Sequence, residues 1–203
     1  MLDMNVINEA FGKLDEELNK ENVKCCICIY GGSAMTFIYD LRHITHDVDY
    51  RIVSAFYADD PKRDVTDIEK AVRRAIRRVG QELDLSDEWM NDGVKGFVSA
   101  NEEFIEDEIA YSNGALVVLA PSPEYLFAMK AMSMRNLEDS PNDRSDLEEL
   151  INILHINDLD AALEIVERFY PARYIQPKTV LGLEMLLNEK RSDESGGGDA
   201  SFP

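Results

Sequence analysis

The chain has 203 residues, of which 45% are hydrophobic and 30% are charged, which is close to the globular average. This length is sufficient for a buried core, and the composition excludes fibrous, collagen-like and wholly disordered proteins. No apolar run approaches the ~18 residues of a membrane span, and the N-terminal stretch is acidic where a signal peptide is basic. We therefore expect a cytoplasmic protein without a membrane partner. The net charge of -19 also disfavours strong non-specific nucleic-acid binding, which depends on clustered cations.

The first part of the chain predicts alternating helices and strands. Helical spacing of apolar residues, a β-rich apolar run, a Gly-Gly turn and a period-two alternation follow one another. In order, they predict a helix over Asn5 to Leu18, a strand over Lys24 to Tyr30, a helix over Ser33 to Leu41 and a strand over His46 to Val53.

The middle of the chain predicts another helix and another strand. Apolar spacing indicates a helix over Thr66 to Leu83, with Thr66 as N-cap and Glu69 as its capping-box partner. Asp87 to Gly93 reads as a short helix, Phe97 to Tyr111 has no clear pattern, and Gly114 to Pro121 predicts a strand.

The last third is predicted to be helical. Helices are expected from Pro123 to Arg135, Asp143 to Leu154, Asp158 to Phe169 and Lys178 to Asn188. Three strands interleaved with helices indicate an α/β (α+β) fold with a mixed sheet. We expect a core over residues 1–122, a helical region over 123–190 and a Gly- and Ser-rich flexible tail over 191–203.

Two groups of residues have both a structural and a functional interpretation. The cysteines, Cys25, Cys26 and Cys28, lack partners at zinc-site spacing, and we interpret them as core residues of a strand. The charged face of the Thr66 to Leu83 helix is interpreted as solvated and paired with acids, the alternative being a phosphate or RNA contact; it comprises Arg73, Arg74, Arg77 and Arg78.

Two short motifs on adjacent elements point to phosphate chemistry. Gly31, Gly32 and Ser33 form a turn between a strand and a helix, where glycine permits close backbone approach and helix amides can face a phosphate. Asp47 and Asp49, two residues apart on the next strand, place two carboxylates on one face. Such a pair suits Mg²⁺ or Mn²⁺, which bind oxygen ligands and complete their shell with water and phosphates.

These motifs resemble the nucleotidyltransferase superfamily of the DNA polymerase beta type. Tyr30 to Asp40 is similar to the Gly-Gly/Ser signature of that family, and Arg42 to Ile52 is similar to its Asp-x-Asp strand. Leu119 to Arg135, followed by Asp143 to Leu150, resembles a Lys-containing helix and an Asp-x-x-Asp-Leu element of a minimal bacterial branch that includes abortive-infection toxins. The resemblance covers about Cys26 to Leu154.

The resemblance implies a role for each matching residue. Asp47 and Asp49 would bind the metal ion and serve catalysis. Gly31, Gly32 and Ser33 would hold the nucleotide. The remaining implied members of the nucleotide site are Arg42, Thr45, Lys130 and Arg135, with Lys130 as the cation that neutralises triphosphate charge and Arg42 and Thr45 orienting the carboxylate loop. Asp143 and Asp146 are expected to contact Lys130 or Arg135 in a mainly structural role.

The function implied is metal-dependent transfer of a nucleotidyl group from an NTP to a hydroxyl of RNA or protein, of a toxin or defence type with a cognate toxin or antitoxin partner. The sequence departs from the family pattern at one point. Active members generally carry a third carboxylate on a later core strand. Ala115 to Ala120 has none, although the acidic run Glu102 to Glu108 is an alternative source. A catalytically degenerate nucleotide-binding or antitoxin-like protein is therefore the alternative to an enzyme.

Overall fold

The structure is a computed structural model that describes residues 1–41, 44–60, 62 and 64–196. Its contacts divide the chain into two compact units. The first unit contains Met1–Gly96 and Glu103–Ser122, and the second contains Phe97–Glu102 and Pro123–Pro203. The predicted α/β class with a mixed sheet is confirmed, because helices alternate with a sheet that has both parallel and antiparallel pairs.

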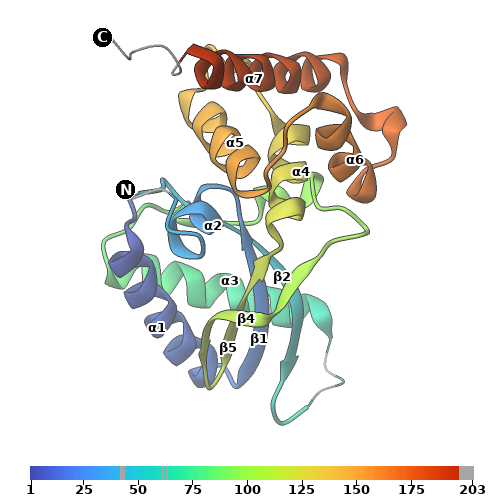
Figure 1. Ribbon diagram of the computed structural model, residues 1–203. Coiled ribbons are helices and arrows are strands. Elements are labelled where there is room, and N and C mark those ends of the chain that lie inside the picture. The colour runs from blue at the N-terminus through green and yellow to red at the C-terminus, as the bar shows by residue number, and fades with distance from the viewer. Residues whose placement is uncertain (42–43, 61, 63, 197–203) are drawn as a thin grey trace. The chain divides into compact units, whose positions relative to one another are not determined.

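The first unit contains a five-stranded sheet within the described residues, in the order β3-β2-β1-β5-β4. The strands are β1 (Val23–Tyr30), β2 (Val48–Tyr57), β3 (Met90–Asn91), β4 (Phe104–Asn113) and β5 (Leu116–Pro121). β1 runs antiparallel to β2 and parallel to β5 (Figure 1). Since six of the eight residues of β1 are buried, it reads as a continuous apolar run typical of a central strand.

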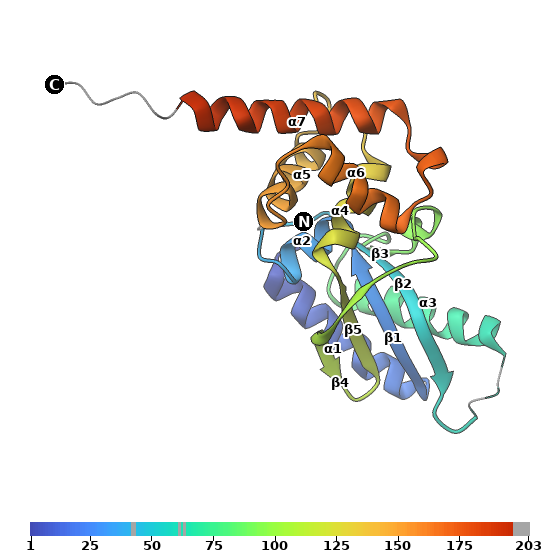
Figure 2. The ribbon, with the colours of Figure 1, turned by 45° about the vertical axis from the view of Figure 1, so that its right-hand side comes forward.

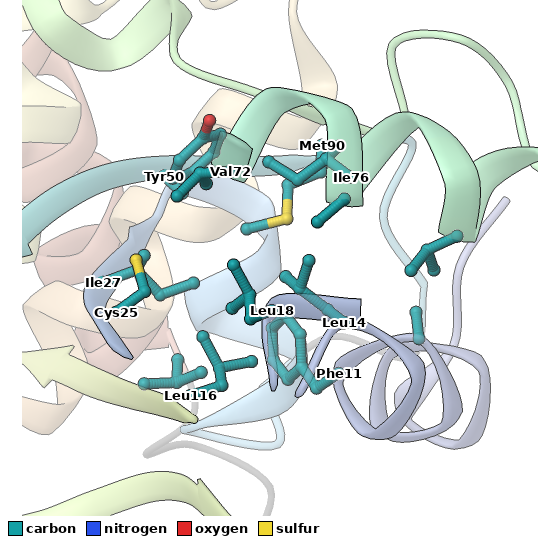
Figure 3. Packing of buried hydrophobic residues seen from close by; sticks show 14 of the residues in the cluster. Phe11, Leu14, Leu18, Cys25, Ile27, Tyr50, Val72, Ile76, Met90 and Leu116 are labelled. Atoms are coloured by element: carbon teal, nitrogen blue, oxygen red, sulfur yellow. The ribbon is translucent and has the colours of Figure 1, made fainter. Parts of the chain in front are cut away.

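Helices α1 (Met4–Lys20) and α3 (Val65–Glu82) lie against the same face of this sheet, as Figure 2 shows. Their apolar faces form one core with the sheet. Phe11 and Leu14 of α1 and Val72 of α3 meet Ile27 and Leu116 of the sheet in that core (Figure 3). The short helix α2 (Gly31–Phe37) follows β1, and a 3-10 turn spans Gly93–Gly96.

The predicted N-cap of α3 and the predicted helix over Asp87 to Gly93 are wrong. The N-cap of α3 is Asp64, whose carboxylate accepts a hydrogen bond from the Thr66 amide at 2.7 Å, and the helix begins one residue before Thr66. The short helix expected over Asp87 to Gly93 is instead the strand β3. Its position is fixed by Trp89, which is 1% exposed and whose backbone oxygen accepts from the Val48 amide at 2.8 Å.

The second unit is helical. It contains α4 (Pro123–Ser133), α5 (Pro141–Ile153), α6 (Leu159–Phe169), a 3-10 turn (Ala172–Tyr174) and α7 (Pro177–Gly196). α4 packs against the other three α-helices, and apolar residues surround its axis. In the ranges the structure describes, no helix has the length and apolar character to cross a membrane.

The predicted tail over residues 191–203 overlaps the end of α7. α7 continues through residues 191–196, while 197–203 lie outside the described residues. At the start of this stretch Arg191 donates to the Asn157 carbonyl at 2.8 Å, and Ser192 donates within α7 to the Asn188 carbonyl at 2.9 Å. Gly and Ser composition alone gave no sign of these contacts.

Asp15 joins α1 to the start of β5. Its Oδ1 atom accepts hydrogen bonds from the backbone amides of Ala115 at 2.7 Å and Leu116 at 2.8 Å, and the residue is 7% exposed. The adjacent Gly114 has a φ of 57°, so the chain reverses between β4 and β5 directly beneath this carboxylate. A single side chain therefore accepts hydrogen bonds from two buried amides at the turn between β4 and β5.

Asp15→Ala is expected to destabilise the first unit by about 3 kcal/mol, because two buried donors lose a charged acceptor. Urea unfolding followed by the fluorescence of Trp89, the single tryptophan, measures this unit. Glu16→Ala is the control, since the Glu16 side chain is 61% exposed and 3.8 Å from Lys13. Equal midpoints of urea unfolding for the two variants would show that Asp15 does not stabilise the start of β5.

Candidate functional site

The candidate site is built on the junction between β1 and α2. β1 ends at Tyr30 and α2 begins at Gly31, with no intervening loop. Gly31 has a φ of 60°, a left-handed conformation that favours glycine. A Cβ atom at Gly31 would lie 2.7 Å from Oδ2 of Asp49. The Asp49 carboxylate thus lies directly against the Gly31 backbone, as expected for two strands in which Tyr30 pairs with Asp49.

Asp47 lies just before β2, not within it, because the strand begins at Val48. Two side chains hold this segment. The Thr45 hydroxyl donates to the Asp47 carbonyl at 3.1 Å, and Asn91 Nδ2 donates to Asp47 Oδ2 at 2.9 Å. Thr45 is itself fixed by two 2.8 Å backbone hydrogen bonds with Leu2. Thr45 thus contacts the backbone of the segment that it was predicted to orient, while Arg42 lies outside the described residues.

The Ser33 side chain faces the protein interior. It is 1% exposed, and its hydroxyl donates to the Tyr30 carbonyl at 2.7 Å. The helix that contains it is shorter than predicted, since α2 ends at Phe37 and not at Leu41. The Ser33 hydroxyl is therefore already engaged in the turn.

The two carboxylates are both half-buried and belong to one unit. Carboxylate oxygens are the ligands that Mg²⁺ and Mn²⁺ prefer, and one or two of them suffice when phosphates complete the shell. No cluster of three His, Cys, Asp or Glu side chains arranged for a metal occurs in the portion of the chain that the structure describes. Asp47 and Asp49 therefore form a two-carboxylate candidate site.

The acidic run Glu102 to Glu108, the alternative source of a third carboxylate, extends into β4. The side chains of residues 106–108 lie outside the described part of the chain. The sheet order places β5 and β1 between β4 and β2, so the strand with the acidic run does not border the strand that carries Asp49.

Asn91 is a site residue that the sequence analysis missed. It lies on β3, in register with Asp49 on β2, and its side chain contacts Asp47. It also lines a cavity of about 200 Å³ together with Tyr50, Arg73 and Arg77. The sequence offered one sign of a site residue here, a neutral polar side chain between Met90 and the acidic Asp92. Because the segment is predicted as a helix, that sign did not point to a contact with Asp47.

Lys130 and Arg135 belong to the second unit and are paired there with acids of α5. Lys130 Nζ lies 2.6 Å from Asp146 Oδ2, with side-chain exposures of 12% and 4%. Arg135 Nε lies 2.8 Å from Asp143 Oδ2, and this contact raises the pKa of Arg135. The predicted contact of Asp143 and Asp146 with these two cations is confirmed.

The arginine face of α3 is largely paired with acids, as its structural interpretation predicts. Arg74 and Arg78 each lie 2.9 Å from Glu21, and Arg73 lies 2.7 Å from Asp92. The neighbouring cations lower the pKa of Glu21. Arg73, Arg74 and Arg78 therefore tie α3 to the end of α1 and to the segment after β3.

The cysteines behave as core residues of β1. Cys25 and Cys28 are 3% and 0% exposed, and burial raises the pKa of each thiol to about 12. Thiols in this state are protonated at neutral pH and unreactive, so the core interpretation is confirmed for these two residues, while Cys26 is half-buried.

Comparison of the chain with protein families, curated proteins and solved structures gave no match.

Lys130→Met is expected to destabilise the second unit by about 3–5 kcal/mol, because it leaves the Asp146 carboxylate buried without its cation. Lys130→Met with Asp146→Leu should recover much of that loss by removing both charges. Thermal unfolding followed by circular dichroism measures the effect. Arg135→Met is the control, with a side chain that is 72% exposed. A stable Lys130→Met single variant would contradict a structural role for this pair.

Proposed function

We propose that the first unit is a metal-dependent nucleotidyltransferase that moves a nucleotidyl group from an NTP to a hydroxyl of RNA or protein. The observation that carries the proposal is the contact between Asp49 Oδ2 and the Gly31 backbone, where a Cβ would come within 2.7 Å. It brings Asp49, one carboxylate of the pair, against the glycine turn, although the two motifs are separate in the sequence. A toxin or defence role, with a cognate protein partner, is proposed from the same resemblance.

Each site residue of the first unit has a distinct role in the proposed reaction. Asp47 and Asp49 hold Mg²⁺ or Mn²⁺, which would supply charge stabilisation on the transferred phosphate. Gly31 and Gly32 lack side chains, so phosphate oxygens can approach their backbone closely, and Ser33 contributes its amide. Thr45 keeps the segment before Asp47 in place through its 3.1 Å hydrogen bond.

The proposed phosphate contacts of Lys130 and Arg135 have weaker support than the carboxylate pair. Each cation already pairs with a carboxylate of α5, and a phosphate would have to compete with that partner. Arg42 completes the proposed nucleotide site from its place in the sequence motif.

A second candidate function is nucleotide binding without transfer, as in a degenerate or antitoxin-like interaction protein. One observation favours it. β5, which pairs in parallel with β1, consists of Leu116–Pro121 and contains no carboxylate that could activate an acceptor hydroxyl.

Mn²⁺ at millimolar concentration is expected to raise the melting temperature of the protein, because a ligand that binds the folded state stabilises it by mass action. Asp47→Asn with Asp49→Asn should remove this increase. Asp59→Asn with Asp60→Asn is a matched control that also removes two neighbouring acids, both exposed. An increase that survives in the Asp47/Asp49 variant would exclude this pair as the metal site.

Incubation with each labelled NTP, Mg²⁺ or Mn²⁺ and total RNA or cell extract is expected to give labelled RNA or protein. Asp49→Ala should reduce transfer at least about 100-fold by removing a metal ligand, whereas Ser33→Ala should reduce it less, because the backbone amide remains. The Asp59/Asp60 variant should transfer normally. NTP binding without transfer to any acceptor would favour the second candidate function.

A further inference from the structure

We propose that Asn91 is a positioning residue of the divalent-cation site, where its amide orients Asp47 and its neutrality limits the site to two carboxylates. This inference rests on the proposed function, because it assigns a role in the metal site that the function requires. Neither the resemblance nor the sequence pattern pointed to this residue.

The orientation of the Asn91 amide is determined by two contacts of opposite kind. Nδ2 donates to Asp47 Oδ2 at 2.9 Å, and Oδ1 accepts from the Gly93 amide at 2.9 Å. The reversed amide would place an oxygen against a carboxylate and an NH₂ group against an N–H, so both contacts would become repulsive. Asn91 therefore presents a donor to Asp47.

The backbone around Asn91 is also fixed. β3 pairs in parallel with β2, so that Asn91 lies beside Asp49 while its side chain reaches Asp47. The adjacent Trp89 anchors the strand through its buried ring, whose Nε1 donates to the Ile76 carbonyl at 3.0 Å. The donor that Asn91 offers to Asp47 is therefore held by the core of the first unit.

A hydrogen bond to a metal-binding carboxylate orients that carboxylate and tunes its affinity for the ion. A neutral amide at this position adds no charge, and a site with two carboxylates holds Mg²⁺ best when substrate phosphates supply further ligands. We infer that Asn91 favours binding of the cation together with the nucleotide over binding of the cation alone.

The test is the affinity of the full-length protein for Mn²⁺ alone, measured from the loss of the free-ion signal in electron paramagnetic resonance. Asn91→Asp has the same shape and keeps the acceptor for Gly93, but it replaces the donor with a third negative charge. We expect it to lower the apo melting temperature by like-charge repulsion and to bind Mn²⁺ about tenfold more tightly, because ligand charge sets cation affinity. Asn91→Ala should bind Mn²⁺ about tenfold more weakly.

Asn136→Asp is the matched control. Asn136 Nδ2 donates to Asp139 Oδ2 at 2.8 Å, an equivalent pair in the second unit. This variant is expected to bind Mn²⁺ as the wild type does. It separates the effect of placing a third charge at the candidate site from that of adding a charge elsewhere.

Wild-type Mn²⁺ affinity in both Asn91 variants, with a lowered melting temperature, would overturn the positioning role and leave the proposed function standing. If Asn91→Asp does not fold, Asn91→Ala decides, and an unchanged affinity in that variant overturns the role. If neither the wild type nor Asn91→Asp binds Mn²⁺ with or without an equimolar mixture of the four NTPs, the metal site itself fails, and the proposed function with it.

Discussion

The candidate site depends on the absence of a side chain at Gly31. β1 passes directly into α2 at this residue, which has a φ of 60° and lies against the Asp49 carboxylate. Any larger residue would meet Asp49 Oδ2 at 2.7 Å and would also adopt a backbone conformation that costs energy for L-residues. A side chain at Gly31 would therefore displace the Asp49 carboxylate from its present position.

This constraint is maintained by the way the first unit is packed. β1 lies between β2 and β5; it pairs with β5 over Cys25 to Cys28, and its last residue, Tyr30, pairs with Asp49 of β2. Asp15 holds the start of β5, and the ion pairs of Arg74 and Arg78 with Glu21 join α3 to α1. The loop before Asp47 is in turn secured by the Leu2–Thr45 bridge. The local geometry of the carboxylates therefore depends on residues from the first helix onward.

The sequence was sufficient to predict α1, whose apolar spacing follows from burial of one face, and β1 and α4, whose nearly continuous apolar runs follow from burial on several sides. It did not predict β3, since a two-residue strand has no period and Met90–Asn91 forms only through pairing with Val48 and Asp49.

The candidate carboxylates were found because two acids at i and i+2 are visible in the sequence. Asn91 was not, because its contact with Asp47 spans 44 residues and depends on that same pairing. The α3 N-cap was misplaced by two residues for a different reason: both Asp64 and Thr66 are good capping residues, and the geometry selects between them.

Charge limits the ways in which the first unit can hold a phosphate. The chain carries a net charge of -19, and within the described ranges most lysine and arginine side chains are already paired with acids. The paired cations are Lys13, Lys20, Lys70, Arg73, Arg74, Arg78, Lys95, Lys130, Arg135 and Arg144. Exposed Arg77 makes no ion pair with another described residue.

An NTP is itself strongly negative, so its approach to this surface is unfavourable over a distance of about 10 Å at 0.1 M salt. Backbone amides of a glycine turn offset only part of that repulsion, because they carry partial charges. A divalent cation held by Asp47 and Asp49 would neutralise these two carboxylates and attract phosphate oxygens as further ligands. Under the proposed function, the metal ion is therefore an electrostatic requirement for nucleotide binding as well as a participant in catalysis. The neutral Asn91 is consistent with that requirement, because a third carboxylate would repel the nucleotide further whenever the cation is absent.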